Sequence, residues 1–352
     1  MRFLPFVFAA VAGLLFSSVL HGASLSSLRK VDGGYARRLV QEVVASLTAR
    51  SLPPRDELEY KEALEAVRAA SLGDFVDESM LYRRIQSLLE TIDSDGHSQL
   101  IRREDAAKWN KIVPPTGPDL FKEQAYISGD ASRGKVLVLR PPQFTVQGET
   151  RIAEAADHFL GNVRESIGYH DACGLVVDLS AQVGGNAWPV LLVLADLVTD
   201  YNTSLISYPS RIRTPLVSRD YLDSLVGKLR SQNQGVLAKF RDTPIGIVIT
   251  GQTASAGEMI AFVLKGERLA RTFGSPSGGS TTVNDVVTLF NGDVLLVSVA
   301  RYAYKGQLEL RGKIFPDVEL PIGSVHGQIV EKAASWVRAA SGCNEHPVGE
   351  GA

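Results

Sequence analysis

The sequence of 352 residues has no excess of charge of either sign. Lys and Arg number 37 and Asp and Glu number 39, so the formal net charge is -2. No basic stripe interleaved with aromatic residues is present, and this argues against a nucleic-acid-binding surface. Internal repeats and low-complexity tracts are also absent. With 45% hydrophobic and 22% charged residues, the composition is globular and allows one large domain or two ordinary ones.

Cysteine is scarce as well, since Cys173 and Cys343 are the only two. This low usage suits an exported chain that does not depend on disulfides. A bond between the two is one option that sequence does not decide, because it depends on how close they lie in the fold. No Cys/His cluster has the spacing of a zinc site, and we expect neither a metal nor a cofactor.

Long hydrophobic runs are also absent, with one exception at the N-terminus. Met1-Arg2 precedes the uncharged stretch Phe3–Leu20, and small residues follow at positions 22 to 24. This order is typical of a secretory signal peptide, which we place at residues 1–23. The alternative is an uncleaved membrane anchor, because the run is just long enough to span a bilayer. No later stretch is apolar enough to do so, and we expect a periplasmic or secreted protein without stable membrane insertion.

Two kinds of sequence pattern follow along the chain. Residues 34–92 carry apolar stripes at helical spacing, and we predict an N-terminal helical domain over 24–110. From about residue 134, short β-branched runs alternate with helical segments, which predicts a mainly parallel sheet in a core domain over 111–342. Residues 343–352 are expected to form a flexible tail. An Asn-Gly-Asp sequence at 291–293 between two β-rich runs predicts a hairpin.

Candidate active-site residues fall at the carboxyl ends of predicted strands, where α/β sheets place their sites. The strand 244–250 leads through a short turn to Ser255 at the start of a helix. Such a serine is either a helix cap or a nucleophile whose neighbouring N–H groups hold an oxyanion. The turn Gly184-Gly185 follows the strand 174–179, and its glycines would let backbone N–H groups approach a substrate.

A serine nucleophile also needs a base and a group that orients it. Among six histidines, His97 is the best candidate. It lies in an Asp-Gly-His-Ser loop at the exit of the helical domain, where it could project over a cleft. Glu258, three residues after Ser255, matches a capping-box position, and a local role is its better interpretation.

Several motifs together resemble the C-terminal processing (tail-specific) serine peptidases and their relatives. They occur in the family's order and cover most of residues 34–322: SDGHS, VVDLSAQVGGN, TASAGE, FGSPSGGSTTVND and IFPDVEL. The resemblance implies a crotonase/Clp-protease-like β-β-α core of the α/β (α+β) class with an N-terminal helical cap domain. Many members insert a PDZ domain, but the segment between His97 and the first core strand is too short for one, since a domain usually has ~100 residues.

Departures from the family pattern matter for the base. The branch with a Ser–Lys dyad carries a lysine in the turn that corresponds to 273–281, and this chain has none there. Lys265 points away on helical periodicity. The resemblance therefore implies the tricorn-like branch, with His97 as base and Glu309 as the acid that orients it. Asp317 is the alternative acid, although its place after Pro316 suits a structural turn.

The sequence thus predicts an exported serine peptidase. The resemblance implies an endopeptidase that acts on polypeptide substrates. Ser255 is the nucleophile, and the N–H of Ala256 with one from Gly184 or Gly185 forms the oxyanion hole. The family's usual Arg and Asn before the glycines are Ser180 and Gln182 here, which questions the rigidity of this loop. Two rivals are an inactive peptide- or lipid-binding member of the same fold and a crotonase-type acyl-CoA enzyme.

Overall fold

The computed structural model describes residues 29–92, 96–109, 125–129, 134–146, 148–166, 171–267, 269–321 and 323–343. The expected signal peptide at residues 1–23 lies outside this part, as do residues 344–352 of the expected tail. Within the described residues, no helix combines the length and apolar character needed to cross a membrane.

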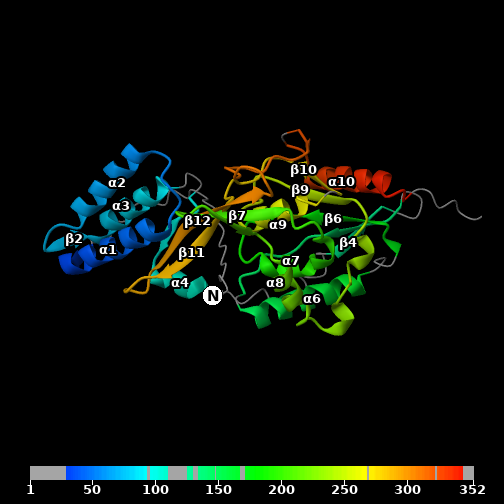
Figure 1. Ribbon diagram of the computed structural model, residues 1–352, viewed down its shortest axis with the longest axis horizontal. Helices are drawn as coiled ribbons and strands as arrows, with labels where there is room; N and C mark the ends of the chain where they lie inside the picture. Colours follow the sequence, from blue (N-terminus) through cyan, green and yellow to red (C-terminus); the bar gives the residue numbers. More distant parts are fainter. Residues whose placement is uncertain are drawn as a thin grey trace, which may run out of the picture.

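The N-terminal helical unit lies at one end of the molecule (Figure 1). It comprises β1 (Lys30–Asp32), α1 (Gly33–Arg50), α2 (Glu57–Ala70), β2 (Phe75–Asp77) and α3 (Glu78–Glu90). An aspartate caps each helix, because the side chains of Asp32, Asp56 and Asp77 accept hydrogen bonds from the free N–H groups of the first turns. The apolar stripes predicted from sequence form its core.

That core continues into a second sheet. Leu289, Leu295 and Val297 are buried in the same hydrophobic cluster as the helices. The sheet has the order β11-β12-β7-β8, and β3 also pairs with β12, opposite Val294–Leu296. Its strands are β3 (Gln99–Ile101), β7 (Thr203–Ser207), β8 (Ile212–Pro215), β11 (Thr282–Thr288) and β12 (Val294–Tyr304). β11 and β12 form the hairpin predicted at the Asn-Gly-Asp turn.

The pairing of β3 with β12 changes one boundary. We expected the helical domain to extend to residue 110, but from Gln99 the chain already forms β3, which pairs with β12 in the second sheet. α4 (Arg103–Trp109) follows directly. The segment that carries His97 is therefore attached to β12 and is not part of the helical bundle.

The main sheet has six strands in the order β13-β10-β9-β6-β5-β4. They are β4 (Ala125–Ser128), β5 (Val136–Leu139), β6 (Gly174–Asp178), β9 (Ile245–Ile249), β10 (Ala270–Gly274) and β13 (Val318–Glu319). All pairings are parallel except that of β4 with β5. This confirms the predicted mixed α/β core with a mainly parallel sheet.

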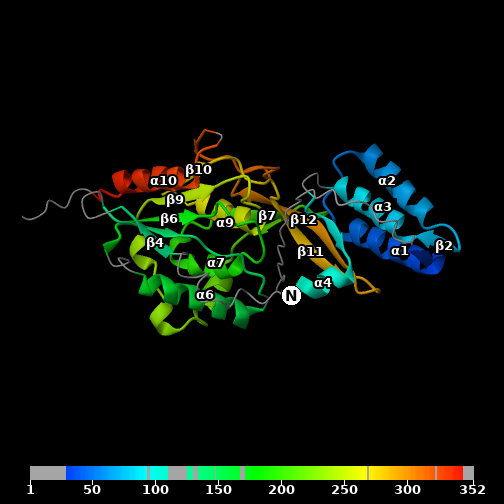
Figure 2. The same cartoon turned by 180° about the vertical axis from the view of Figure 1, so that it is seen from behind.

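Helices cover both faces of this sheet (Figures 1 and 2). Alternate side chains of β6 show the division: Leu175 and Val177 pack into the larger cluster, and Val176 packs against α10 (His326–Ala340). The larger cluster is completed by α6 (Glu149–Glu165), α7 (Trp188–Val193), α8 (Arg219–Val226) and α9 (Ala256–Lys265), with the short 3-10 helices η2 (Ala195–Leu197) and η4 (Ala238–Phe240). A further 3-10 helix, η3 (Ser231–Asn233), follows α8. Both faces are buried, which explains the continuous apolar runs of these strands.

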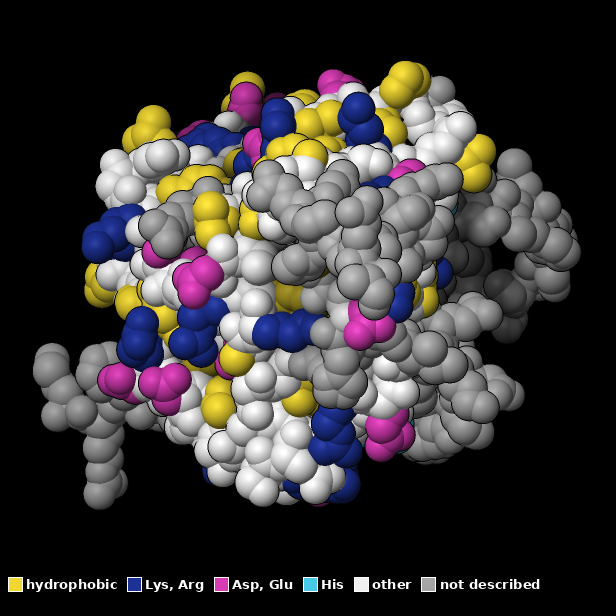
Figure 3. All heavy atoms as spheres, turned by 90° about the vertical axis from the view of Figure 1, so that its right-hand side faces the viewer, with side chains coloured by type: hydrophobic (Ala, Val, Ile, Leu, Met, Phe, Trp, Pro, Cys, Tyr) yellow, Lys and Arg dark blue, Asp and Glu magenta, His cyan; other side chains and the backbone are white. Residues whose placement is uncertain are grey.

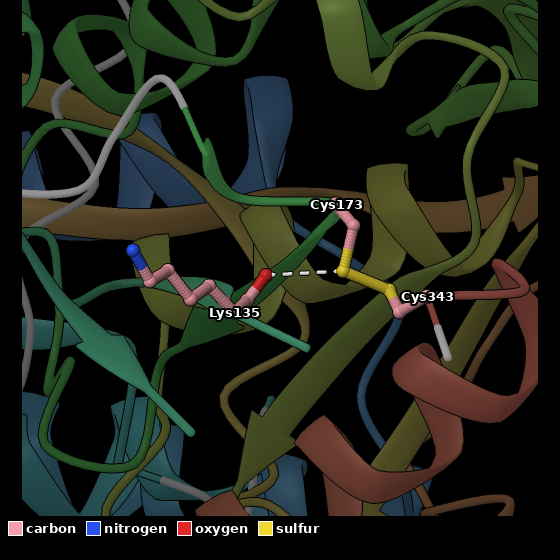
Figure 4. The surroundings of a disulfide bond; sticks show 3 residues. All are labelled: Lys135, Cys173 and Cys343. Carbon is pink, nitrogen blue, oxygen red and sulfur yellow. Dashed lines mark hydrogen bonds between the residues drawn. A yellow bond between two sulfur atoms is a disulfide. The ribbon is translucent and has the colours of Figure 1, made fainter. Parts of the chain in front are cut away.

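A disulfide joins Cys173, just before β6, to Cys343, just after α10 (Figure 4). Their Cα atoms are 5.7 Å apart across a sequence separation of 170 residues. The sulfur of Cys173 also contacts the carbonyl oxygen of Lys135 at 3.1 Å. Residue 343 is therefore tied to the sheet and does not begin a free tail. On the face shown in Figure 3, basic and acidic side chains are interspersed among small apolar patches.

Candidate active site

Ser255 occupies the turn between β9 and α9. Its backbone has φ of 50°, which is unfavourable for a residue with a side chain. The turn before it is anchored: Thr253 Oγ1 donates to the carbonyl oxygen of Leu179 at 2.8 Å and accepts from the N–H of Thr250 at 2.9 Å. The serine is fully buried. Residues held in such conformations cluster at functional sites.

Ser255, the N-cap residue of α9, shares a capping box with Glu258. Its Oγ lies 3.0 Å from Nε2 of His97. The two residues are 158 positions apart in sequence, so only the tertiary fold brings them together. This distance is within the range of a nucleophile paired with a base.

His97 is held from the other side by β11. Its Nδ1 lies 2.5 Å from Oγ1 of Thr282, and its carbonyl oxygen accepts from Nδ2 of Asn284 at 2.7 Å. His97 is 3% exposed. Thr282 was not identified from sequence, although it falls within the FGSPSGGSTTVND motif.

The structure does not bring Glu309 to His97, which corrects the expected position of the acid. Glu309 lies beyond β12 in a bridge with Ala303. Its carboxylate accepts from the hydroxyl of Tyr208 and from Nε of Arg311 at 3.1 Å. Burial alone would raise the pKa of Glu309, but these hydrogen bonds and the charge of Arg311 hold it below the usual range. Glu309 is thus committed to partners away from the imidazole.

Asp317, the alternative acid, is also bound elsewhere. It accepts from the N–H and the hydroxyl of Thr272 at 2.9 and 2.8 Å and forms an ion pair with Lys265. Burial would raise its pKa, but the hydrogen bonds from Lys265 and Thr272 lower it. The same pair accounts for Lys265, whose ammonium is bound to Asp317.

The loop carrying Gly184 and Gly185 is firmly held despite its departures from the family pattern. Nε2 of Gln182 donates to the carbonyl oxygen of Pro142 at 2.9 Å, and the carbonyl of Gln182 accepts from the N–H of Ala254 at 3.1 Å. Gly185 has φ of 103°, and a Cβ there would lie 2.2 Å from the carbonyl oxygen of Phe144. Only glycine fits this position.

The start of α9 and the loop that carries Gly184 meet next to the serine turn. Ala256 is the first residue of α9, so its N–H has no carbonyl four residues back within the helix. Gly257 packs so tightly on Gln182 that an added Cβ would lie 2.2 Å from its carbonyl oxygen. The loop of Gly184 and the start of α9 are therefore in direct contact. This arrangement is suited to binding an oxyanion between them.

Glu258 ties a third loop to the turn that carries Ser255. It is fully buried and accepts three hydrogen bonds: from the N–H of Ser255 at 3.0 Å, the N–H of Gly279 at 2.7 Å and the hydroxyl of Ser277. The bond to Ser255 is the local one expected of a capping box. The other two fasten the glycine-rich segment after β10 over the start of α9.

Asp178 anchors the base of the Gly184 loop. Its carboxylate is buried and accepts from Nε of Arg140 at 2.9 Å and from the N–H of Ser180 at 3.1 Å, and it lies 2.8 Å from Nε2 of His326. Burial alone would raise the pKa of Asp178, but the hydrogen bonds from Ser180 and Arg140 and the charge of His326 lower it. The carboxylate is thus ionised at neutral pH. Among the described residues, no group of His, Cys, Asp and Glu could hold a metal ion.

Comparison with known families decides the class of protein. The model of "Peptidase family S41" matches residues 135–320, which include β5, the Gly184 loop, Ser255 and the β11–β12 hairpin. The chain belongs to peptidase family S41. The S41 match begins after His97, so the family model does not cover that residue.

Curated relatives share shorter stretches with this chain. It is 28% identical to the nisin-resistance protein of Lactococcus lactis subsp. lactis over 173 residues, 47% of this chain and 50% of that protein. It is 33% identical over 79 residues to the chloroplastic carboxyl-terminal-processing peptidase 2 of Arabidopsis thaliana, 22% of this chain and 15% of that protein. The chain spans half or less of the curated relatives that it matches.

One solved structure shares the fold over nearly its whole length. A lipoprotein from Streptococcus agalactiae superposes with a TM-score of 0.64 at 17% sequence identity. The match covers 90% of this chain and 99% of that one. The helical unit and the core are therefore arranged as in a natural protein of known structure.

Proposed function

We propose that the protein is an exported serine peptidase in which Ser255 is the nucleophile and His97 is the general base. The single observation that carries the proposal is the 3.0 Å contact between Ser255 Oγ and His97 Nε2. Membership of peptidase family S41 supports it. A plain helix cap would not explain a buried serine in a strained conformation whose oxygen faces an imidazole.

In the proposed reaction, the oxygen of Ser255 attacks a peptide carbonyl carbon while Nε2 of His97 takes the hydroxyl proton. The N–H of Ala256 and one from Gly184 or Gly185 hold the oxyanion of the tetrahedral intermediate. The proton on His97 then passes to the leaving amine, and water hydrolyses the acyl-enzyme with His97 again as base. Loss of one oxyanion donor typically lowers the rate about 10²–10³-fold.

The substrates in this proposal are polypeptides. One similar protein is named as a carboxyl-terminal-processing peptidase, and a peptidase acts on polypeptides. Bonds cleaved within a chain would make this protein an endopeptidase. The site needs no metal or cofactor for the proposed chemistry.

Export is part of the proposal. The apolar run Phe3–Leu20 with its small-residue exit indicates a signal peptide. The disulfide between Cys173 and Cys343 supports an oxidising compartment, because such bonds rarely persist in the cytosol. The similarity to a streptococcal lipoprotein also favours a cell-envelope location, periplasmic or secreted.

Labelling with a serine-reactive fluorophosphonate tests the proposal. We expect the wild-type protein to label, and Ser255→Ala and His97→Ala to lose labelling while their circular dichroism spectra are unchanged. Ser231→Ala on η3 and His158→Ala on α6 are matched controls at exposed positions and should label normally. Labelling that persists in Ser255→Ala would refute the nucleophile, and a folded wild-type protein that never labels would favour the inactive, ligand-binding alternative.

A further inference from the structure

The buried polar side chains around His97 form a closed circuit. Nδ1 of His97 contacts Oγ1 of Thr282 at 2.5 Å, and this oxygen lies 3.0 Å from Oγ of Ser298. The hydroxyl of Ser298 bonds to Oδ1 of Asn284 at 2.8 Å, and Nδ2 of Asn284 returns to the carbonyl oxygen of His97 at 2.7 Å. Thr282, Ser298 and Asn284 are each at most 2% exposed.

The direction of every bond in this circuit follows from one group. The carbonyl oxygen of His97 can only accept, so the amide nitrogen of Asn284 must face it and Oδ1 must face Ser298. Ser298 then uses its single proton to donate to Oδ1, and its oxygen accepts from the hydroxyl of Thr282. Thr282 has no proton left for the ring, so Nδ1 of His97 must be the donor.

We propose that Thr282 is a positioning residue that holds His97 in the Nδ1–H tautomer, the form whose bare Nε2 can accept the proton of Ser255. The inference rests on the proposed function for its catalytic meaning. In this form, Nε2 carries a lone pair toward Ser255 Oγ at 3.0 Å. The opposite tautomer would reverse the circuit and set the amide oxygen of Asn284 against the carbonyl oxygen of His97.

A β-bulge makes the circuit possible. The register of β11 and β12 shifts between Val283 and Asn284, so that Val283 pairs with Ala300 and Asn284 with Ser298. Val299 is the extra residue on β12. Because directly opposed residues share one face of a sheet, the shift places a serine hydroxyl opposite Asn284, where an unshifted register would place Val299.

Nuclear magnetic resonance tests the tautomer directly and needs no catalysis. In wild-type protein with ¹⁵N-labelled histidine, the ring signals of His97 are assigned by their disappearance in His97→Gln. At a pH above the range in which the ring titrates, we expect these signals to show a protonated Nδ1 and an unprotonated Nε2. A wild-type ring with its proton on Nε2 would overturn the inference. This readout stays valid even if fluorophosphonate labelling disproves the peptidase function.

Kinetics of labelling supply the second test. Thr282→Val keeps the shape but removes the hydroxyl, and its labelling rate constant should fall about 10²-fold or more, within the usual contribution of a general base. Thr282→Ser should recover most of the rate and keep the Nδ1–H signal. Thr288→Val, at the exposed end of the same strand, should label like wild type. A folded Thr282→Val protein with wild-type labelling would overturn the positioning role.

Discussion

The disulfide between Cys173 and Cys343 should be a major source of stability without being part of the active site. It closes a chain segment of 170 residues. In the chain-entropy model, a loop of this length restricts the unfolded chain by an amount worth about 5 kcal/mol. For a chain of this size, where each kcal/mol moves Tm by roughly 2 °C, this predicts a Tm lower by roughly 10 °C without the bond.

The perturbation is the double variant Cys173→Ser and Cys343→Ser, with Tm measured by calorimetry or circular dichroism. Dithiothreitol should lower the Tm of the wild-type protein toward that of the variant and should leave the variant unchanged. The fluorophosphonate labelling rate at room temperature should be retained, because the bond lies at the start of β6 and Asp178 at the opposite end borders the site. A variant whose Tm equals that of the oxidised wild type would refute this reasoning.

Three further outcomes are expected. Gly185→Ala should lower the labelling rate about 10²-fold, because its Cβ would lie 2.2 Å from the carbonyl oxygen of Phe144 and displace an oxyanion donor; unchanged labelling would exclude this loop from the oxyanion hole. Asp178→Asn should cost about 2–4 kcal/mol of unfolding free energy at pH 7. Since the folded pKa of Asp178 is lowered, its contribution exists above its ordinary pKa and is lost as the pH falls through the folded value. The variant should therefore approach wild-type stability in denaturant titrations on the acid side, and a constant difference would contradict the ionised pair. Lys265→Ala should label at the wild-type rate, because its ammonium is paired with Asp317; a large loss would reopen a Ser–Lys mechanism.

Local pattern was sufficient to predict the helices and strands and the turn that carries Ser255. Alternation of β-branched runs with helical stripes predicted the parallel sheet, and the Asn-Gly-Asp turn predicted the β11–β12 hairpin. These signals are readable because periodicity and turn chemistry depend on neighbouring residues. Ser255 and the Gly184 loop were found in the same way, since both follow strands that end at one edge of the sheet.

The partner of His97 was not readable in this way. The orienting group was sought among acids at family spacing, and Glu309 was chosen, but its carboxylate is held by Tyr208 and Arg311. Thr282 reaches the ring because β11 and β12 pair with a shifted register, and a bulge of one residue leaves no clear mark in a β-rich sequence. Spacing along the chain could not show that Thr282, and not Glu309, contacts the ring of His97.

The sequence by itself determined where the strands, helices and reactive turns lie, because each depends on contacts within a few residues. Only the tertiary structure decided which distant groups meet. It brought Ser255 into contact with His97, 158 positions away in sequence, and Cys173 into contact with Cys343, 170 positions away. Such pairs depend on strand order and register, and these are set by packing of the whole core, which no short stretch of sequence encodes.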